Sequence, residues 1–268
     1  MFLAFDAAGQ RVPPTKGADG TCPRCLRVVH AKCGKQKIRH WAHEKGMNDC
    51  DPWAESETQW HRDWQARAGL EWCEVVMGEL REHRADIRRP DDGLVIELQH
   101  SYIKHEEVRE REAFYGNLWW VFNTEPWRFR AEIAADGRAR FRWMSRRRTL
   151  DAATRPVYLD LGGPLLRVTG YGPQGCVSGF GELLSRTEFI SRVGLRPLSD
   201  EELKQTSHYS VLQRDGDILL ARSLEDLRTW DSQDAMATHH DLAGRTSVVK
   251  IPVIPLGPFE RDPAVREH

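Results

Sequence analysis

A carboxylate lies in the middle of an apolar stretch, LVIELQHS (residues 94–101), and this feature strongly limits how the chain can fold. The stretch predicts a β-strand with Leu94, Ile96 and Leu98 on one face and Glu97 and Gln99 on the other. A buried carboxylate is costly unless it meets a partner. The fold must therefore bring Glu97 to a hydrogen-bond donor, to water or to a metal ion.

The segments around this strand predict the order αβββαβ. Ser56 and Gln59 form a Ser-x-x-Gln capping box, so we expect a helix to begin near Glu57. PDDG, residues 90–93, predicts a tight turn before the central strand. The remaining elements are expected as strands at 71–77, 79–89, 94–101 and 118–124, with a helix at 105–116 that ends at Gly116.

Asp86 and Glu97 lie on the two strands that this turn connects. Adjacent antiparallel strands would bring both carboxylates within reach of one divalent cation, with Glu57 as a third oxygen ligand. Such ligands suit Mg²⁺ or Mn²⁺, which can activate water for phosphodiester cleavage. Gln99 would orient the water or the phosphate. The alternative is that Asp86 and Glu97 only form ion pairs, with partners among Arg84, Arg88 and Arg111.

Two further pairs share helical faces in this region. His61 lies four residues after Glu57, which favours either a place in the active site or a structural role. Arg111 and Tyr115 have the same spacing, which fits a phosphate contact from Arg111 or ordinary packing against the sheet.

Four of the six cysteines fall in the first fifty residues, which favours a metal site over disulfides. Cys22 and Cys25 form a Cys-x2-Cys knuckle, and His40 and His43 complete a Cys2His2 zinc site. The His-x2-His spacing is tighter than usual, so Cys33 or Cys50 could replace one histidine. The alternative is a set of free thiols.

A run of basic residues without an acidic one accompanies this cluster. We expect it to contact nucleic-acid backbone phosphates without reading bases, although a charge run can also be only a solvated face. A basic hairpin, residues 127–144, would extend the surface, and Trp127 and Trp143 beside it could stack on bases or belong to the core. The residues of the run are Arg24, Arg27, Lys32, Lys35, Lys37 and Arg39.

The whole chain of 268 residues has a net charge of −1, so any polyanion-binding surface must be local. No apolar run is long enough to span a bilayer, and MFLAF is too short for a signal-peptide core. These features predict a cytoplasmic protein that does not bind membranes. We expect four regions: a zinc module at 1–53, a nuclease core at 54–126, a basic extension at 127–148 and an α+β accessory domain of unknown role at 149–268.

Several fragments occur together in order: CPRC, RHWAH, ESETQWH, RADI, VIELQHS and REAFY. In this combination the chain resembles the competence protein CoiA-like family, whose members are similar to PD-(D/E)XK nucleases with the restriction-endonuclease-like fold. The resemblance covers about residues 1–124. It implies an α/β nuclease with Asp86 and Glu97 as the acidic motif residues, and Gln99 where the motif usually carries lysine.

The same resemblance assigns Glu57 and His61 to the first helix of the active site, and Arg111 and Tyr115 to the second. It implies a DNA nuclease with little sequence specificity, acting in recombination, competence or the processing of incoming DNA. An amide at Gln99 offers only a dipole where lysine would offer a charge. The alternatives are a weakly catalytic DNA-binding partner of a recombinase, a defence nuclease or one acting on RNA, and a purely structural zinc protein.

Overall fold

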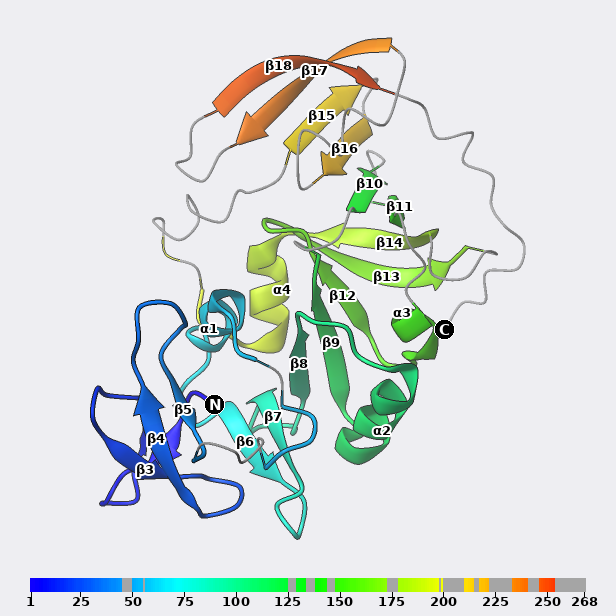
Figure 1. Cartoon of the computed structure of the whole chain (residues 1–268). Coiled ribbons are helices and arrows are strands. Elements are labelled where there is room, and N and C mark those ends of the chain that lie inside the picture. Colours follow the sequence, from blue (N-terminus) through cyan, green and yellow to red (C-terminus); the bar gives the residue numbers. More distant parts are fainter. Residues whose placement is uncertain are drawn as a thin grey trace. The chain divides into compact units, whose positions relative to one another are not determined.

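The structure, a computed structural model, divides the chain into two compact units, Met1–Ser101 and Tyr102–His268. It describes residues 1–44, 50–54, 56–124, 129–133, 138–143, 148–172, 178–197 and 199, and the backbone of four strands between 210 and 253. These parts form a mixed α/β protein that is rich in strands and has few helices (Figure 1). The boundary after Ser101 falls within the predicted core region 54–126, so each unit is described by itself.

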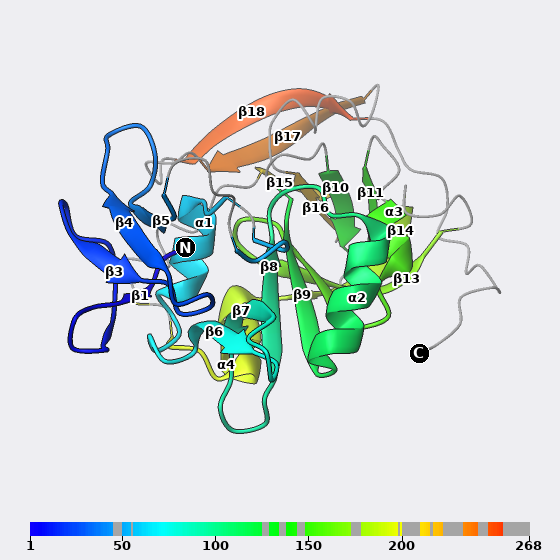
Figure 2. The same cartoon turned by 60° about the horizontal axis from the view of Figure 1, so that its bottom comes forward.

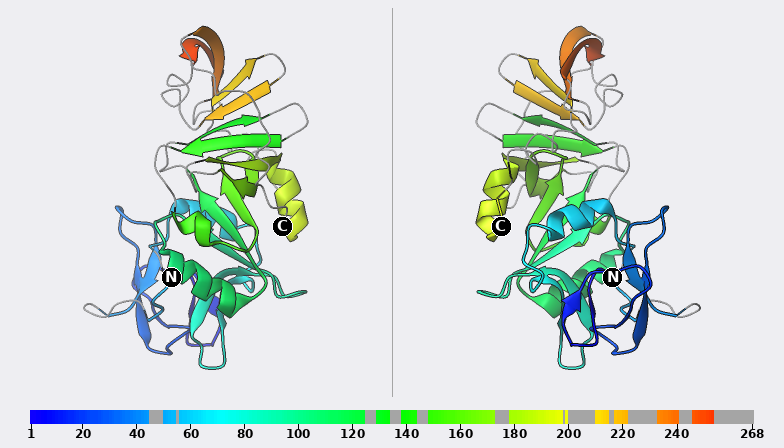
Figure 3. Two further views of the ribbon diagram at one scale, coloured as in Figure 1. Left: turned by 90° about the vertical axis from the view of Figure 1, so that its right-hand side faces the viewer. Right: turned by 90° about the vertical axis from the view of Figure 1, so that its left-hand side faces the viewer.

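The first unit opens with a five-stranded antiparallel sheet in the order β2-β1-β3-β4-β5, drawn in blue in Figure 3. Its strands are only two to five residues long, because glycine and proline turns interrupt the chain repeatedly. They are β1 (Ala4–Phe5), β2 (Arg11–Val12), β3 (Asp19–Thr21), β4 (Val28–Lys32) and β5 (His40–Ala42).

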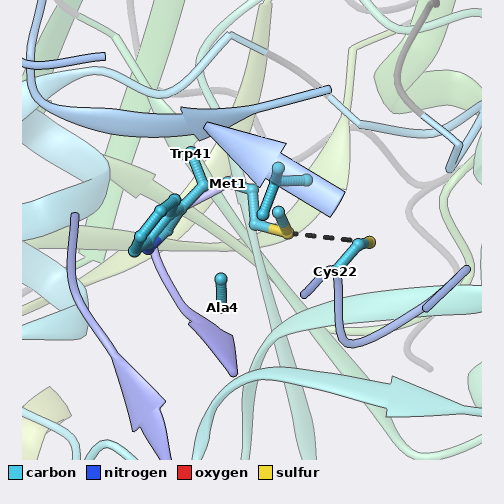
Figure 4. Packing of buried hydrophobic residues seen from close by; sticks show 5 residues of the cluster. Met1, Ala4, Cys22 and Trp41 are labelled. Carbon is cyan, nitrogen blue, oxygen red and sulfur yellow. Dashed lines mark hydrogen bonds between the residues drawn. The ribbon is translucent and has the colours of Figure 1, made fainter. Parts of the chain in front are cut away.

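The core of this small sheet is a cluster of Met1, Ala4, Cys22, Val29 and Trp41 (Figure 4). The Trp41 indole is anchored by its Nε1–H, which donates to the Val12 carbonyl at 3.0 Å. A core of this size contributes little stability, and sheets of this kind usually need a disulfide or a metal ion as well. Cys22, which belongs to this cluster, therefore matters for the stability of the sheet.

The second half of the unit contains α1 (Gln59–Gln65) and the antiparallel strands β6 (Cys73–Met77), β7 (His83–Arg88) and β8 (Val95–Gln99). The helix begins two residues later than predicted from Ser56, because Thr58 is its N-cap. Thr58 Oγ1 accepts from the His61 backbone N–H, and the His61 ring bonds back to the Thr58 backbone. The capping box is therefore Thr58 with His61.

Strands β7 and β8 form an antiparallel hairpin, as predicted. Ile87 lies opposite Ile96 and Arg88 lies opposite Val95, and the backbone ladder ends there, next to Asp86 and Glu97. Gly93 closes the turn with φ 71°, a left-handed conformation that glycine adopts without strain. All five residues of β8 are buried, so both faces of this strand are covered.

The second unit contains one long sheet in the order β18-β17-β15-β16-β10-β11-β14-β13-β12-β9, in which only β9 and β12 run parallel. The first strands are β9 (Leu118–Asn123), β10 (Phe129–Ile133), β11 (Arg138–Trp143), β12 (Val157–Asp160), β13 (Leu165–Tyr171) and β14 (Ser178–Leu184). The others are β15 (Ser210–Arg214), β16 (Asp217–Ala221), β17 (Gln233–His240) and β18 (Thr246–Val253).

Helices contact both faces of this sheet at its β9–β12 end (Figure 2). On one face, α2 (His105–Tyr115) accepts a hydrogen bond at Glu112 from Trp120 Nε1, at 3.0 Å, and α3 (Arg148–Ala152) packs beside α2. On the other face, α4 (Arg186–Val193) packs Phe189 against Tyr158, with ring centroids 4.8 Å apart. Helix α2 ends at Gly116 as predicted.

Helix α4 begins directly after β14. Residues 181–184 belong to β14, and Ser185 caps α4 by accepting from the Glu188 backbone N–H at 3.1 Å. The Asp136–Gly137 turn, Trp127 and the final segment 254–268 lie outside the described residues. Within the part of the chain that is described, no helix is long and apolar enough to cross a membrane.

Candidate metal centre and carboxylate pair

Cys22, Cys25, His43 and Cys50 bring their ligand atoms within 4.8 Å of one another. The Sγ atoms of Cys22 and Cys50 are 3.6 Å apart, and Cys25 Sγ is 3.2 Å from His43 Nε2. Ligand atoms around a tetrahedral zinc ion, with Zn–S bonds of about 2.3 Å, are separated by about 3.7 Å. This Cys3His group could therefore hold a metal ion such as zinc.

The first two ligands lie on a tight turn between β3 and β4. The Cys22 backbone N–H donates to the Arg27 carbonyl at 2.8 Å, and the Leu26 N–H donates back to the Cys22 carbonyl at 3.0 Å. Leu26 has φ 60°, in the left-handed region, and its side chain is 59% exposed. The turn folds both thiols toward one point, as the Cys-x2-Cys spacing predicted.

The fourth member of the group is Cys50 and not His40, which corrects the predicted Cys2His2 set. Side chains alternate across a strand, so His40 and His43 point to opposite faces around β5, and only His43 shares the face of the buried Trp41. The His40 Nδ1 instead lies 2.9 Å from the Ile38 carbonyl. Cys33 also stays outside the group, with its Sγ directed at the Pro14 carbonyl.

Without a metal, the two close thiols compete for a proton. The hydrogen bond from Cys50 lowers the pKa of the buried Cys22 thiol, and the same contact raises the pKa of Cys50. Cys22 is thus the thiol that ionises first. A thiolate is the form that binds metal.

Two arginines tie the Cys-x2-Cys turn to the β6–β7 loop. Arg24 Nε donates to the Glu82 carbonyl at 2.6 Å, and its Nη1 donates to the carbonyl of Cys50. In return, Arg81 Nε donates to the Arg24 carbonyl at 3.1 Å, and its Nη2 to the Pro23 carbonyl. Arg24 is therefore committed to this contact, unlike the free phosphate-binding residue expected from the sequence.

Asp51, the residue after the last cysteine ligand, joins the cluster to β7. Its side chain is 3% exposed; Oδ2 accepts from the Arg84 backbone N–H at 2.8 Å, and Oδ1 lies 3.0 Å from His83 Nδ1. The His83 ring also stacks on Trp53. Since Asp86 follows on the same strand, the metal group and the carboxylate pair share one structural support.

Asp86 and Glu97 each reach across the β7–β8 ladder to the opposite backbone. Asp86 Oδ2 accepts from the Leu98 N–H at 2.8 Å, and Glu97 Oε1 accepts from the Asp86 N–H at 3.4 Å. Glu97 is 2% exposed, whereas Asp86 is partly exposed. The two carboxylates are therefore neighbours on adjacent strands.

His61 contacts the same residue, Leu98, through its backbone carbonyl. Its Nε2 lies 2.9 Å from the Leu98 carbonyl, which can only accept, so Nε2 carries the hydrogen. Its Nδ1 is 2.9 Å from Thr58 Oγ1. Burial lowers the pKa of His61 to about 4, so the ring is neutral near pH 7. His61 therefore orients β8 from α1, and both its ring nitrogens are engaged.

Gln99 is buried on the same face of β8 as Glu97, and its Nε2 donates to the Ser101 carbonyl at 3.1 Å. Glu57 lies elsewhere. Its carboxylate contacts the Met1 ammonium at 3.2 Å and the Arg62 guanidinium. Among the described residues, no group of three or more possible metal ligands includes Asp86, Glu97 or Glu57. The structure thus does not bring the predicted third ligand to the pair.

Glu74 is a buried carboxylate that the sequence analysis missed. It accepts from the Phe2 and Leu3 backbone N–H groups at 2.8 and 2.6 Å, and its own φ is 47°, in the left-handed region. Burial, followed by the nearby Glu74 charge, raises the pKa of Glu57 to about 7. The signal was available, because Glu74 interrupts the apolar strand CEVVM just as Glu97 interrupts LVIELQ.

The remaining predicted residues have the following positions. In the second unit, the buried Arg111 donates to Glu107 Oε1 through Nε and Nη2, at 3.1 and 2.5 Å, and the buried Tyr115 packs edge-on against Phe114. In the first unit, the loop between β4 and β5 leaves its basic side chains exposed. These exposed residues are Lys32, Lys35, Lys37 and Arg39, and Arg27 is exposed on the Cys-x2-Cys turn.

Comparison of the chain with family models, with curated proteins and with solved structures finds no match. Its function must therefore be inferred from the geometry of these sites.

Proposed function

We propose that the protein is a metal-dependent nuclease that cleaves DNA phosphodiester bonds with little sequence specificity. The observation that supports this proposal is the proximity of the two carboxylates: Glu97 Oε1 accepts from the Asp86 N–H at 3.4 Å, and Asp86 Oδ2 accepts from the Leu98 N–H at 2.8 Å. Two carboxylates fixed on neighbouring strands of a hairpin form a rigid pair. Rigid strands hold reactive groups more accurately than loops do.

Asp86 and Glu97 would hold Mg²⁺ or Mn²⁺. One or two carboxylates suffice for such an ion, which keeps several waters and binds substrate phosphate, so the absence of Glu57 from the pair is compatible with it. When bound, the ion supplies an activated water and stabilises developing negative charge. Gln99, on the face of Glu97, would orient the phosphate, and His61 would keep β8 in place through the Leu98 carbonyl.

The exposed basic loop between β4 and β5 would hold the DNA backbone. Lys35, Lys37 and Arg39 are exposed there, next to the β-sheet that carries the Cys3His group. Phosphate contacts fix position without reading bases, which fits cleavage with little sequence preference. The resemblance to the CoiA-like family favours a role in DNA processing, recombination or competence, and defence against phage would use the same chemistry.

A cleavage assay tests the proposal. Linear, circular and single-stranded DNA are incubated with the purified protein and Mg²⁺ or Mn²⁺, and with Glu97→Gln in parallel. We expect metal-dependent cutting that the variant loses by at least about a hundredfold, because the variant lacks one anionic metal ligand. The matched control is Glu82→Gln on the β6–β7 loop, which should cut normally. Equal cutting by Glu97→Gln would overturn the assignment.

A second candidate is a DNA-binding accessory protein for a recombinase, with weak or no cleavage. The side-chain amide of Gln99, where a nuclease usually has a lysine, favours it, as does the engagement of Glu57 by Arg62. DNA binding without any cutting in either metal, unchanged by Glu97→Gln, would select this candidate.

A further inference from the structure

The sheet of the second unit has one face that is lined with arginines. Arg138, Arg140 and Arg142 alternate along β11 with the buried Ala139 and Phe141. Side chains two residues apart on a strand share a face and repeat about every 6.8 Å. Arg138 and Arg142 are exposed and Arg140 is partly exposed, so this face of β11 is open to solvent.

The neighbouring strands continue the same face. Arg138 lies opposite Glu182 of β14, and Glu182 lies opposite Arg167 of β13. Arg167 and Glu182 form an ion pair at 3.4 Å, with side chains 42% and 55% exposed. Among the described side chains that β11, β13 and β14 place on this face, arginines therefore outnumber acidic residues.

An aromatic residue lies in the middle of these arginines. Phe180 of β14 is opposite Arg140, and it is partly exposed, while its neighbours Gly179 and Gly181 are buried. Those glycines face the covered side, where an added Cβ would meet Phe141 or the Arg167 backbone within 2.4 Å. The alternation thus fixes Phe180 on the arginine side.

Helix α4 limits the face at one end. Tyr158 of β12 is opposite Arg167 and is covered by Phe189 of α4, so the open part begins beyond this helix. Figure 1 shows α4 beside β12, and β14, β11 and β10 following in the sheet. The arginines are thus grouped on a bounded, open strip of the sheet.

We propose that this arginine face binds single-stranded nucleic acid, with phosphates on Arg138, Arg140, Arg142 and Arg167 and a base stacked on Phe180. Regularly spaced guanidinium groups fit a polymer of regularly spaced charges, and a partly exposed aromatic ring favours unpaired bases over a duplex. This surface goes beyond the proposed nuclease site and does not depend on cleavage. It adds a binding function to the second unit.

The test measures the binding of the full chain to a labelled single-stranded oligonucleotide by fluorescence anisotropy. Magnesium is omitted, and Glu97→Gln is present throughout so that cleavage cannot interfere. The double variant Arg138→Gln/Arg142→Gln should bind more weakly, and its salt dependence, the slope of log K against log salt, should fall by about 1.4. Phe180→Ala should weaken binding on the order of tenfold, and Phe180→Leu should reproduce the loss without removing the side-chain volume.

The control is Arg109→Gln/Arg155→Gln, which removes the same charge from exposed positions on and beside α2. It should leave binding nearly unchanged. Equal loss in this control, no change in the Arg138/Arg142 variant, or equal binding of a duplex or of polyglutamate would overturn the proposal. Since no step is catalytic, an inactive nuclease site would leave the expected binding result unaltered.

Discussion

The Cys3His group and the Asp86–Glu97 pair differ in how the fold brings their possible metal-binding atoms together. The first gathers four ligand atoms from turns far apart in the sequence, all within 4.8 Å. The second places two carboxylates on adjacent strands, where each accepts a hydrogen bond from the opposite backbone. A site with four protein ligands is closed and suits a structural metal, whereas a site with fewer leaves positions for water and substrate. The comparison separates a group that would stabilise the fold from one that could react.

The largest effect should come from breaking the closed group. Cys50→Ser removes one of the four possible ligands, so we expect the purified variant to contain less zinc than the wild type. We expect its free energy of unfolding to fall by several kcal/mol, because the free energy of binding a structural metal contributes to folding. Metal content is measured by elemental analysis and stability by thermal unfolding.

Matched controls decide the ligand set. His40→Ala and Cys33→Ser change the two residues that the sequence analysis considered but that lie outside the group. Both should keep the full metal content. Metal loss in His40→Ala with retention in Cys50→Ser would restore the Cys2His2 set and contradict the structure.

The next effect concerns the support of the carboxylate pair. Because burial lowers the pKa of His61 to about 4 from an ordinary 6.5, the unfolded chain binds the proton more readily than the folded one. The contribution of His61 to stability is therefore complete above about pH 6.5 and is lost as the pH falls toward 4, a change of about 3 kcal/mol. The difference in unfolding free energy between wild type and His61→Gln should shrink over this range in urea titrations.

Glu57→Gln is the informative counterpart, since the raised pKa of Glu57, about 7, gives the opposite sign. The wild type should lose stability relative to this variant as the pH rises from about 4.5 to 7. Parallel pH profiles for the two variants would show that one of these groups is not buried as described.

A smaller effect should follow from loosening the connection between the two sites. Asp51→Asn keeps one oxygen for the Arg84 N–H but replaces the other oxygen, which lies 3.0 Å from His83 Nδ1, with an amide NH2. We therefore expect a loss of about 1–2 kcal/mol without loss of metal. The exposed Asp92→Asn removes the charge of the surface pair with Arg89 and keeps an oxygen for the Leu94 N–H, so this control should change stability little. A larger effect at Asp92 would contradict the proposed role of Asp51.

The sequence predicted the features that depend on local patterns. The β7–β8 hairpin, helix α2 with its end at Gly116, and the Cys-x2-Cys turn follow from short-range alternation, turn residues and spacing. The choice between His40 and Cys50 depended on which face of β5 carries the buried Trp41, and local spacing does not contain that information. Similarly, the capping box predicted at Ser56 lies at Thr58 in the structure, because the tertiary contact of His61 with Leu98 favours the later start of the helix.

The position of Glu57 shows a different limit. On the sequence it lies in the first turn of a predicted helix, close to the active residues of the resemblance, but in the structure it meets Arg62 and the Met1 ammonium. The contact between Glu57 and Met1 joins residues 56 positions apart, and a periodic sequence pattern does not reveal such a contact. Ion pairs depend on the three-dimensional fold. The sequence therefore identifies the carboxylates but does not show which group each of them contacts.

The reciprocal arginine–carbonyl hydrogen bonds between the Cys-x2-Cys turn and the β6–β7 loop have a consequence for engineering. Arg24 donates to the Glu82 carbonyl, and Arg81 donates to the Arg24 carbonyl. The conformation of each loop therefore depends on the length of the other. Shortening either loop by one residue would leave an arginine and several carbonyls without partners. The Cys-x2-Cys turn therefore cannot be transferred to another scaffold by itself. A graft would have to include the β6–β7 loop as well.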